Sequence, residues 1–126
     1  ATPSILKFVM SVVNKSQIGV PTLMTCLVYL NRVRSRTSSF LNFQPSCPHR
    51  IFLAALILAA KYVNDASPMN KRWARYSSMR AVPKLIFSLA EINRMEIDLL
   101  RLLDWDLRIS IEDLYCQIRP LMPTVR

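Results

Sequence analysis

Ten consecutive apolar residues, IFLAALILAA at Ile51–Ala60, constrain the fold of this chain more than any other feature. A helix that is apolar on every side is buried among other elements, and a run of this length is too short to span a bilayer. Ser46 and Pro48 stand just before the run, where they favour a helix start. We therefore predict a central helix from about residue 49 to 64, packed on all sides by the rest of the chain.

Composition favours an all-α fold. The chain has 126 residues, 52% of them hydrophobic, and its only glycine is Gly19. Sheet proteins need more glycines than this for their turns. The length suits one compact domain, which we place over residues 1–126. Segments with apolar residues at helical spacing precede and follow the central helix, and Ser110 with Asp113 predicts a last helix from about 110 to 119.

The segment SLAEINRMEIDLLRLLDWDL, residues 88–107, predicts a long amphipathic helix with one misplaced charge. It opens with a capping box, because Ser88 can accept a hydrogen bond from the helix start and Glu91 can reach back to it. At roughly 100° per residue, the apolar side chains form one arc. Glu96 falls inside that arc, about 40° from Ile92. A carboxylate there is costly unless a cation or a hydrogen-bond donor meets it.

Lys61 is a second charge at an apolar position, because it follows the ten apolar residues of the central helix directly. In a compact bundle the end of that helix and the middle of the long helix can be neighbours, so we predict that Lys61 meets Glu96. Two interpretations stay open. The pair either specifies packing within the chain, or it borders an apolar patch offered to a partner.

The net charge of +9 is unevenly distributed. No acidic residue precedes Asp65, whereas seven basic residues do, among them Arg32, Arg34 and Arg36. A basic surface suits nucleic acid, anionic lipid or an acidic or phosphorylated protein, and it also occurs simply as a solvated face. We regard these three arginines as a candidate docking face.

Few residues suit catalysis or metal binding. Cys26, Cys47 and Cys116 are odd in number and widely spaced, so neither a disulfide framework nor a CxxC zinc site is expected. His49, the single histidine, stands beside a proline at a helix start, where we expect a surface position or a capping role. One glycine cannot make a phosphate-binding loop. We expect no enzyme, no metal or cofactor, no membrane span, and an intracellular location in the nucleus or the cytoplasm.

Two segments resemble a cyclin box. LAALILAAKYVND is similar to its third helix, in which a run rich in small residues ends in lysine followed by an aromatic residue, and NRMEIDLLRLLDWDL is similar to its fifth. The intervening NDASPMNKRWARY most resembles the fungal Pcl-type cyclins, which activate a phosphate- and stress-responsive cyclin-dependent kinase. The resemblance covers about residues 3–107. It implies a five-helix bundle, to which residues 110–119 add a C-terminal helix.

The resemblance also implies a function and a site. In cyclins, the lysine and glutamate at the positions of Lys61 and Glu96 form a pair that hydrogen-bonds the kinase near its movable C-helix. Leu100, Trp105 and Leu107 align with apolar residues that pack on that kinase helix. The chain would then be a regulatory subunit that forms a heterodimer with a cyclin-dependent kinase and activates it, without doing chemistry itself.

Two further points accompany this interpretation. The first helix, SILKFVMSVV, lacks the substrate-docking motif of mitotic-type cyclins, so substrates would instead meet the basic face of Arg32, Arg34 and Arg36. The alternative function is nucleic-acid binding, because cyclin-like folds in general transcription factors bind DNA and the arginines could contact phosphates. Against it, no recognition-helix signature occurs in the sequence.

Overall fold

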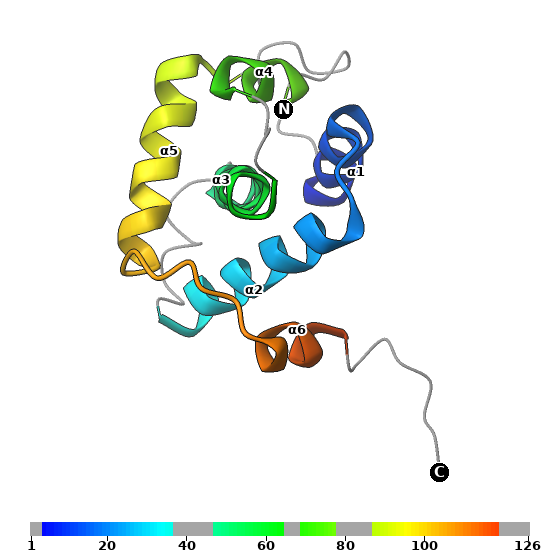
Figure 1. Ribbon diagram of the computed structural model, residues 1–126. Coiled ribbons are helices and arrows are strands. Elements are labelled where there is room, and N and C mark those ends of the chain that lie inside the picture. The colour runs from blue at the N-terminus through cyan, green and yellow to red at the C-terminus, as the bar shows by residue number, and fades with distance from the viewer. Residues whose placement is uncertain (1–3, 37–46, 65–68, 78–86, 119–126) are drawn as a thin grey trace.

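The structure consists of α-helices over the residues that it describes. This computed structural model describes residues 4–36, 47–64, 69–77 and 87–118 (Figure 1). Its helices are α1 (Ile5–Ser16), α2 (Val20–Arg36), α3 (Cys47–Val63), α4 (Asn70–Tyr76), α5 (Leu89–Leu102) and α6 (Ile111–Ile118). Because no strand occurs in these ranges, the predicted all-α class is confirmed.

Helix α3 is the central helix. Figure 1 shows it nearly end-on, with α1, α2, α4 and α5 arranged around it. Every residue from Ile51 to Ala60 is buried, with a relative exposure of 6% or less. The predicted central helix is therefore confirmed, although it runs from Cys47 to Val63 and not from 49 to 64.

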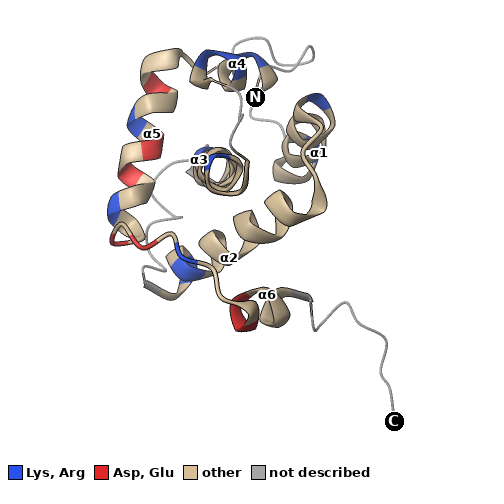
Figure 2. Ribbon diagram, in the orientation of Figure 1, with Lys and Arg blue, Asp and Glu red and all other residues tan. Residues whose placement is uncertain are grey.

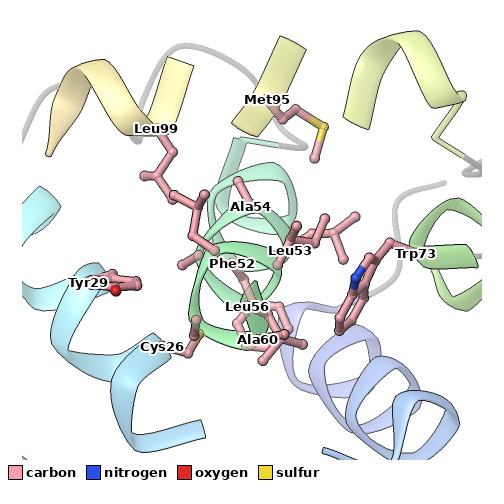
Figure 3. Packing of buried hydrophobic residues seen from close by; sticks show 14 of the residues in the cluster. Cys26, Tyr29, Phe52, Leu53, Ala54, Leu56, Ala60, Trp73, Met95 and Leu99 are labelled. Atoms are coloured by element: carbon pink, nitrogen blue, oxygen red, sulfur yellow. The ribbon is translucent and has the colours of Figure 1, made fainter. Parts of the chain in front are cut away.

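The outer helices are held on α3 by large buried side chains (Figure 3). Phe8 from α1, Tyr29 from α2 and Trp73 from α4 have no exposed surface, and Leu99 from α5 is 2% exposed. Burying an apolar side chain of this size stabilises a fold by about 1.5–3 kcal/mol. Each outer helix therefore has an anchor that favours its packing against the core.

Serine side chains cap three of the helices. Ser4 accepts a hydrogen bond from the backbone N–H of Lys7 at the start of α1. At α5, Ser88 and Glu91 form the predicted capping box, and the hydrogen bond from the Ser88 backbone lowers the pKa of the Glu91 carboxyl. Ser110 bonds Asp113 in the same reciprocal way at the start of α6. The helix predicted at about 110 to 119 is thus confirmed.

His49 does not lie at the surface, which was one of the two expectations for it. Its side chain is 4% exposed, and its ring meets that of Phe8 edge-on with a centroid distance of 5.0 Å. The cause is α1, which packs on α3 and covers the side of the helix that carries His49. The residues adjacent to His49 in the sequence do not predict this long-range contact.

Candidate partner-binding site

Lys61 and Glu96 form an ion pair between two helices. Lys61 lies in the last turn of α3, and Glu96 lies in the middle of α5. The ammonium Nζ donates to Glu96 Oε2 at 2.8 Å and to Oε1 at 3.0 Å. The two opposite charges that the sequence places at apolar positions therefore meet, as predicted.

The pair lies at the edge of the core and not beneath it. The Lys61 side chain is 38% exposed and that of Glu96 is 14% exposed. Because the charged atoms still reach solvent, the pair avoids most of the desolvation cost that a fully buried ion pair carries. A partner that covers this pair meets charges already fixed in place, which confers orientation and specificity.

Asn70 is a third member of this cluster. Its amide Nδ2 donates to Glu96 Oε1 at 2.8 Å and to Asn93 Oδ1 at 2.7 Å. An asparagine at the start of a helix is typical of a cap, but the capping position of α4 is Met69, which makes no side-chain cap bond. Asn70 is instead the first residue of α4, and it holds the carboxylate that Lys61 also holds.

Replacing Asn70 with alanine is expected to destabilise the fold by about 1.5–3 kcal/mol, the usual contribution of a hydrogen bond to a charged group. Alanine offsets a few tenths of this because it favours the helix. The matched control is Asn31→Ala, since Asn31 is exposed on α2 and its replacement gains the same helix propensity. Urea unfolding measures both variants. Equal free energies of unfolding would show that Asn70 contributes nothing through Glu96.

Apolar side chains accompany the pair at the surface. Leu100 and Leu107 are half-buried against the core, and Trp105 is 63% exposed. Tyr62 at the end of α3 is 47% exposed, and its hydroxyl accepts a hydrogen bond from the backbone N–H of Ile109 at 3.4 Å. Tyr62 thus connects the end of α3 to the segment after α5. We define the partner strip as Lys61, Tyr62, Glu96, Leu100, Trp105 and Leu107.

The chain leaves α5 through a left-handed turn. Asp104 and Trp105 have φ values of 56° and 58°, which residues other than glycine adopt at a cost of about 1–3 kcal/mol each. The Trp105 N–H donates to the Leu100 oxygen at 2.9 Å and closes the turn. Two such residues in succession persist only where the surrounding structure holds them.

Arg32 does not contribute to an exposed basic face. Its guanidinium pairs with Asp113 at 2.9 Å, and its side chain is only 20% exposed. It also donates to two backbone oxygens of the segment between α5 and α6, at 3.1 and 2.6 Å. Arg34 is exposed, whereas the side chain of Arg36 lies outside the described residues. Arg32 is thus less suited to a docking face than predicted, because its side chain is mostly buried and three of its five N–H donors bond acceptors within the fold.

The chemistry of the strip is hydrogen bonding and apolar contact. Among the described side chains, no three of the His, Cys, Asp and Glu type gather as a metal site. Within the part of the chain that the structure describes, no helix is long and apolar enough to cross a membrane. Cys26 is buried, and burial raises the pKa of its thiol to about 12, so it stays protonated and unreactive at neutral pH.

Comparison with known proteins identifies the family. The family described as "Cyclin, N-terminal domain" matches residues 2–108. This chain belongs to the cyclin family. It is similar to PHO85 cyclin-1 of Saccharomyces cerevisiae, with 43% identity over 98% of this chain and 42% of that protein. PHO85 cyclin-2 of the same yeast is 39% identical over 98% of this chain and 38% of that protein.

A further relative of this cyclin domain is the G1/S-specific cyclin pas1 of Schizosaccharomyces pombe, with 34% identity over 66% of this chain and 20% of that protein. No solved structure matches the chain. The cyclin domain spans about two fifths of the length of the two PHO85 cyclins. Their similarity confirms the predicted resemblance to the fungal Pcl type. The roles of the individual strip residues stay predictions.

Proposed function

We propose that this cyclin domain binds a cyclin-dependent kinase and acts as its regulatory subunit. The observation that carries the proposal is the Lys61–Glu96 pair, which lies at the edge of the core and is followed directly in α3 by the exposed side chain of Tyr62. Relatives named as PHO85 cyclins support a partner of the kind that the Pcl resemblance implies, a phosphate- and stress-responsive kinase. With an intracellular kinase as partner, we also propose a location in the nucleus or the cytoplasm.

The partner strip suits a movable helix of the kinase. Lys61 Nζ carries three protons and a carboxylate has several lone pairs, so both groups keep hydrogen-bonding capacity for a partner. Tyr62 and Trp105 add exposed apolar surface. A kinase helix that packs here gains free energy in only one of its positions, and this differential binding shifts the kinase toward that conformation.

In the favoured position, the kinase helix completes the Lys–Glu ion pair of the kinase and helps to order its activation loop. The cyclin then supplies binding free energy and orientation, and we propose that it contributes no catalytic group. All the chemistry of phosphoryl transfer belongs to the kinase in this proposal.

Reconstitution tests the proposed function. The chain is expressed in its source cells, kinases that co-purify with it are identified, and each is then mixed with the purified chain. We expect a stable heterodimer whose activity on a peptide substrate is well above that of the kinase alone. Absence of both a stable complex and activation, with every cyclin-dependent kinase of those cells tested, would reject the proposal.

Nucleic-acid binding is the less favoured function. Figure 2 shows Lys and Arg spread over α1 to α5 and not gathered on one helix, and Arg32 is bound within the fold. A domain that bound DNA through phosphate contacts would lose most of its affinity between low and physiological salt. Kinase binding that survives the same change in salt separates the two functions.

Of the three arginines in the predicted docking face, Arg34 is the described one that remains exposed and suits acidic or phosphorylated substrates. It is exposed near the end of α2. We expect Arg34→Glu to lower kcat/KM for an acidic peptide by up to about fivefold, the range of one exposed charge pair, without changing kinase binding. A neutral peptide serves as the control substrate. Loss of kinase binding would instead place Arg34 in the kinase interface.

A further inference from the structure

The segment between α5 and α6 carries two residues of the partner strip, Trp105 and Leu107. Its turn is left-handed at Asp104 and Trp105, so groups outside the turn must hold it in one conformation. The side chain of Trp105 is 63% exposed, so it is available to a partner and is not packed in the core. Leu107 packs against the core, and the backbone of the segment is bonded from α2.

Helix α2 binds three consecutive backbone oxygens of this segment. The Tyr29 hydroxyl donates to the Leu107 oxygen at 2.9 Å. Arg32 donates through Nη1 to the Asp106 oxygen at 3.1 Å and through Nη2 to the Arg108 oxygen at 2.6 Å. Residues three apart project from the same face of a helix, so both side chains reach the segment together.

Both donors are themselves fixed in place. Tyr29 has no exposed surface, and burial raises the pKa of its hydroxyl, so the group remains a donor at neutral pH. Arg32 is tied to Asp113 at 2.9 Å. Asp113 in turn accepts a hydrogen bond from the Ser110 N–H at 2.9 Å, at the start of α6. The two side chains thus link α2 to the segment and to the helix that follows it.

We propose that Tyr29 and Arg32, here called the brace, are positioning residues that hold the segment between α5 and α6 so that Trp105 and Leu107 are presented to the kinase. This inference rests on the proposed function. Neither brace residue belongs to the partner strip, so each acts through the backbone of the segment. Without the brace, only the fraction of molecules with Trp105 in place binds, and the apparent affinity falls by that fraction.

Tyr29→Phe and Arg32→Met test the brace in the full chain. Tyr29→Phe keeps the buried ring and removes one hydrogen bond, and Arg32→Met keeps an unbranched apolar stem and removes the guanidinium. We expect Tyr29→Phe to weaken kinase binding by up to about tenfold, the equivalent of one net hydrogen bond. Arg32→Met removes three hydrogen bonds, so we expect it to weaken kinase binding at least as much. Circular dichroism confirms that the helices are retained.

Tryptophan fluorescence supplies a readout of Trp105, provided that each variant is measured under conditions in which it is fully folded. Trp73 is buried and Trp105 is exposed, so acrylamide quenching of the free chain reports on Trp105. We expect the quenching constant to rise in both brace variants. The matched control is Arg94→Met, because Arg94 is 77% exposed and lies about 160° around α5 from Glu96. Kinase affinity and quenching should both be unchanged in it.

A double-mutant cycle with Trp105→Ala separates failure of the brace from failure of the proposed function. If the brace acts through Trp105, Tyr29→Phe weakens kinase binding much less once Trp105 is alanine. Fully additive losses of affinity would overturn the brace and leave the proposed function standing. The same holds if Trp105→Ala weakens kinase binding but Tyr29→Phe and Arg32→Met do not. Kinase binding that neither these substitutions nor Glu96→Ala weakens would overturn the partner strip as the interface, and the brace with it, whereas absence of both a kinase complex and activation would overturn the proposed function itself.

Discussion

Replacing Glu96 with alanine is expected to weaken kinase binding by about 2–5 kcal/mol, the range for removing one member of a covered, hydrogen-bonded charge pair. In the free domain the loss is smaller, because the Lys61 side chain is 38% exposed and its ammonium regains water. In the complex the kinase covers that ammonium, which is then unpaired and desolvated. Isothermal titration calorimetry with the purified kinase measures the difference between Glu96→Ala and the unmodified chain.

Glu96→Gln and Lys61→Ala separate the contributions of charge and hydrogen bonding. The glutamine keeps an oxygen that can accept from both Lys61 and Asn70 but carries no charge, so we expect an intermediate loss. Lys61→Ala leaves the carboxylate, only 14% exposed, with Asn70 as its described donor. We therefore expect Lys61→Ala to lower the stability of the free domain as well as kinase binding.

The chain offers a matched control for the pair on the same helix. Arg94 and Asp98 form an i,i+4 ion pair at 3.5 Å whose side chains are 77% and 45% exposed. Asp98→Ala removes the same type of charge from α5, but exposed pairs contribute only about 0–1 kcal/mol. If Glu96→Ala bound the kinase as tightly as Asp98→Ala does, Glu96 would have no special role in the interface.

The features that the sequence predicts correctly depend on residues close together in the chain. Ile51–Ala60 identifies the central helix because its apolar character on every side needs no knowledge of the neighbours. Ser88 and Glu91 are three residues apart, so their capping box is visible in the sequence. Lys61 and Glu96 are far apart in the sequence, yet each is a charge at an apolar position of its own helix. Because the two charges are opposite, the sequence predicts that they pair.

The features that the sequence does not reveal depend on contacts across the fold. Asn70 resembles a helix cap, and its hydrogen bond to Glu96 spans 26 positions. Arg32 resembles a charge that suits the end of a helix, and its contact with Asp113 spans 81 positions. Periodicity tells which side of a helix is apolar but not which element covers it, so the burial of His49 by α1 escapes prediction for the same reason.

Leu56→Ala is expected to lower the free energy of unfolding by about 2–5 kcal/mol. Leu56 has no exposed surface and lies in the middle of α3 (Figure 3). Helices pack on several sides of α3, so they cannot all move inward to fill the cavity that the lost side chain leaves. The matched control is Leu6→Ala, because Leu6 is 66% exposed on α1. We expect that control to change stability by no more than about 0.5 kcal/mol.

The same variant distinguishes loss of fold from loss of the binding surface. A small domain has about 5–15 kcal/mol of total stability, so Leu56→Ala leaves a larger unfolded fraction but an intact partner strip in the folded molecules. Osmolytes that favour burial should therefore restore the kinase binding of Leu56→Ala. They should not restore the kinase binding of Glu96→Ala, because that variant loses affinity at the interface and not through unfolding. Equal unfolding free energies for Leu56→Ala and Leu6→Ala would contradict the central position of α3. Binding that osmolytes rescued equally in Leu56→Ala and Glu96→Ala would show that Glu96 acts through stability and not through the kinase interface.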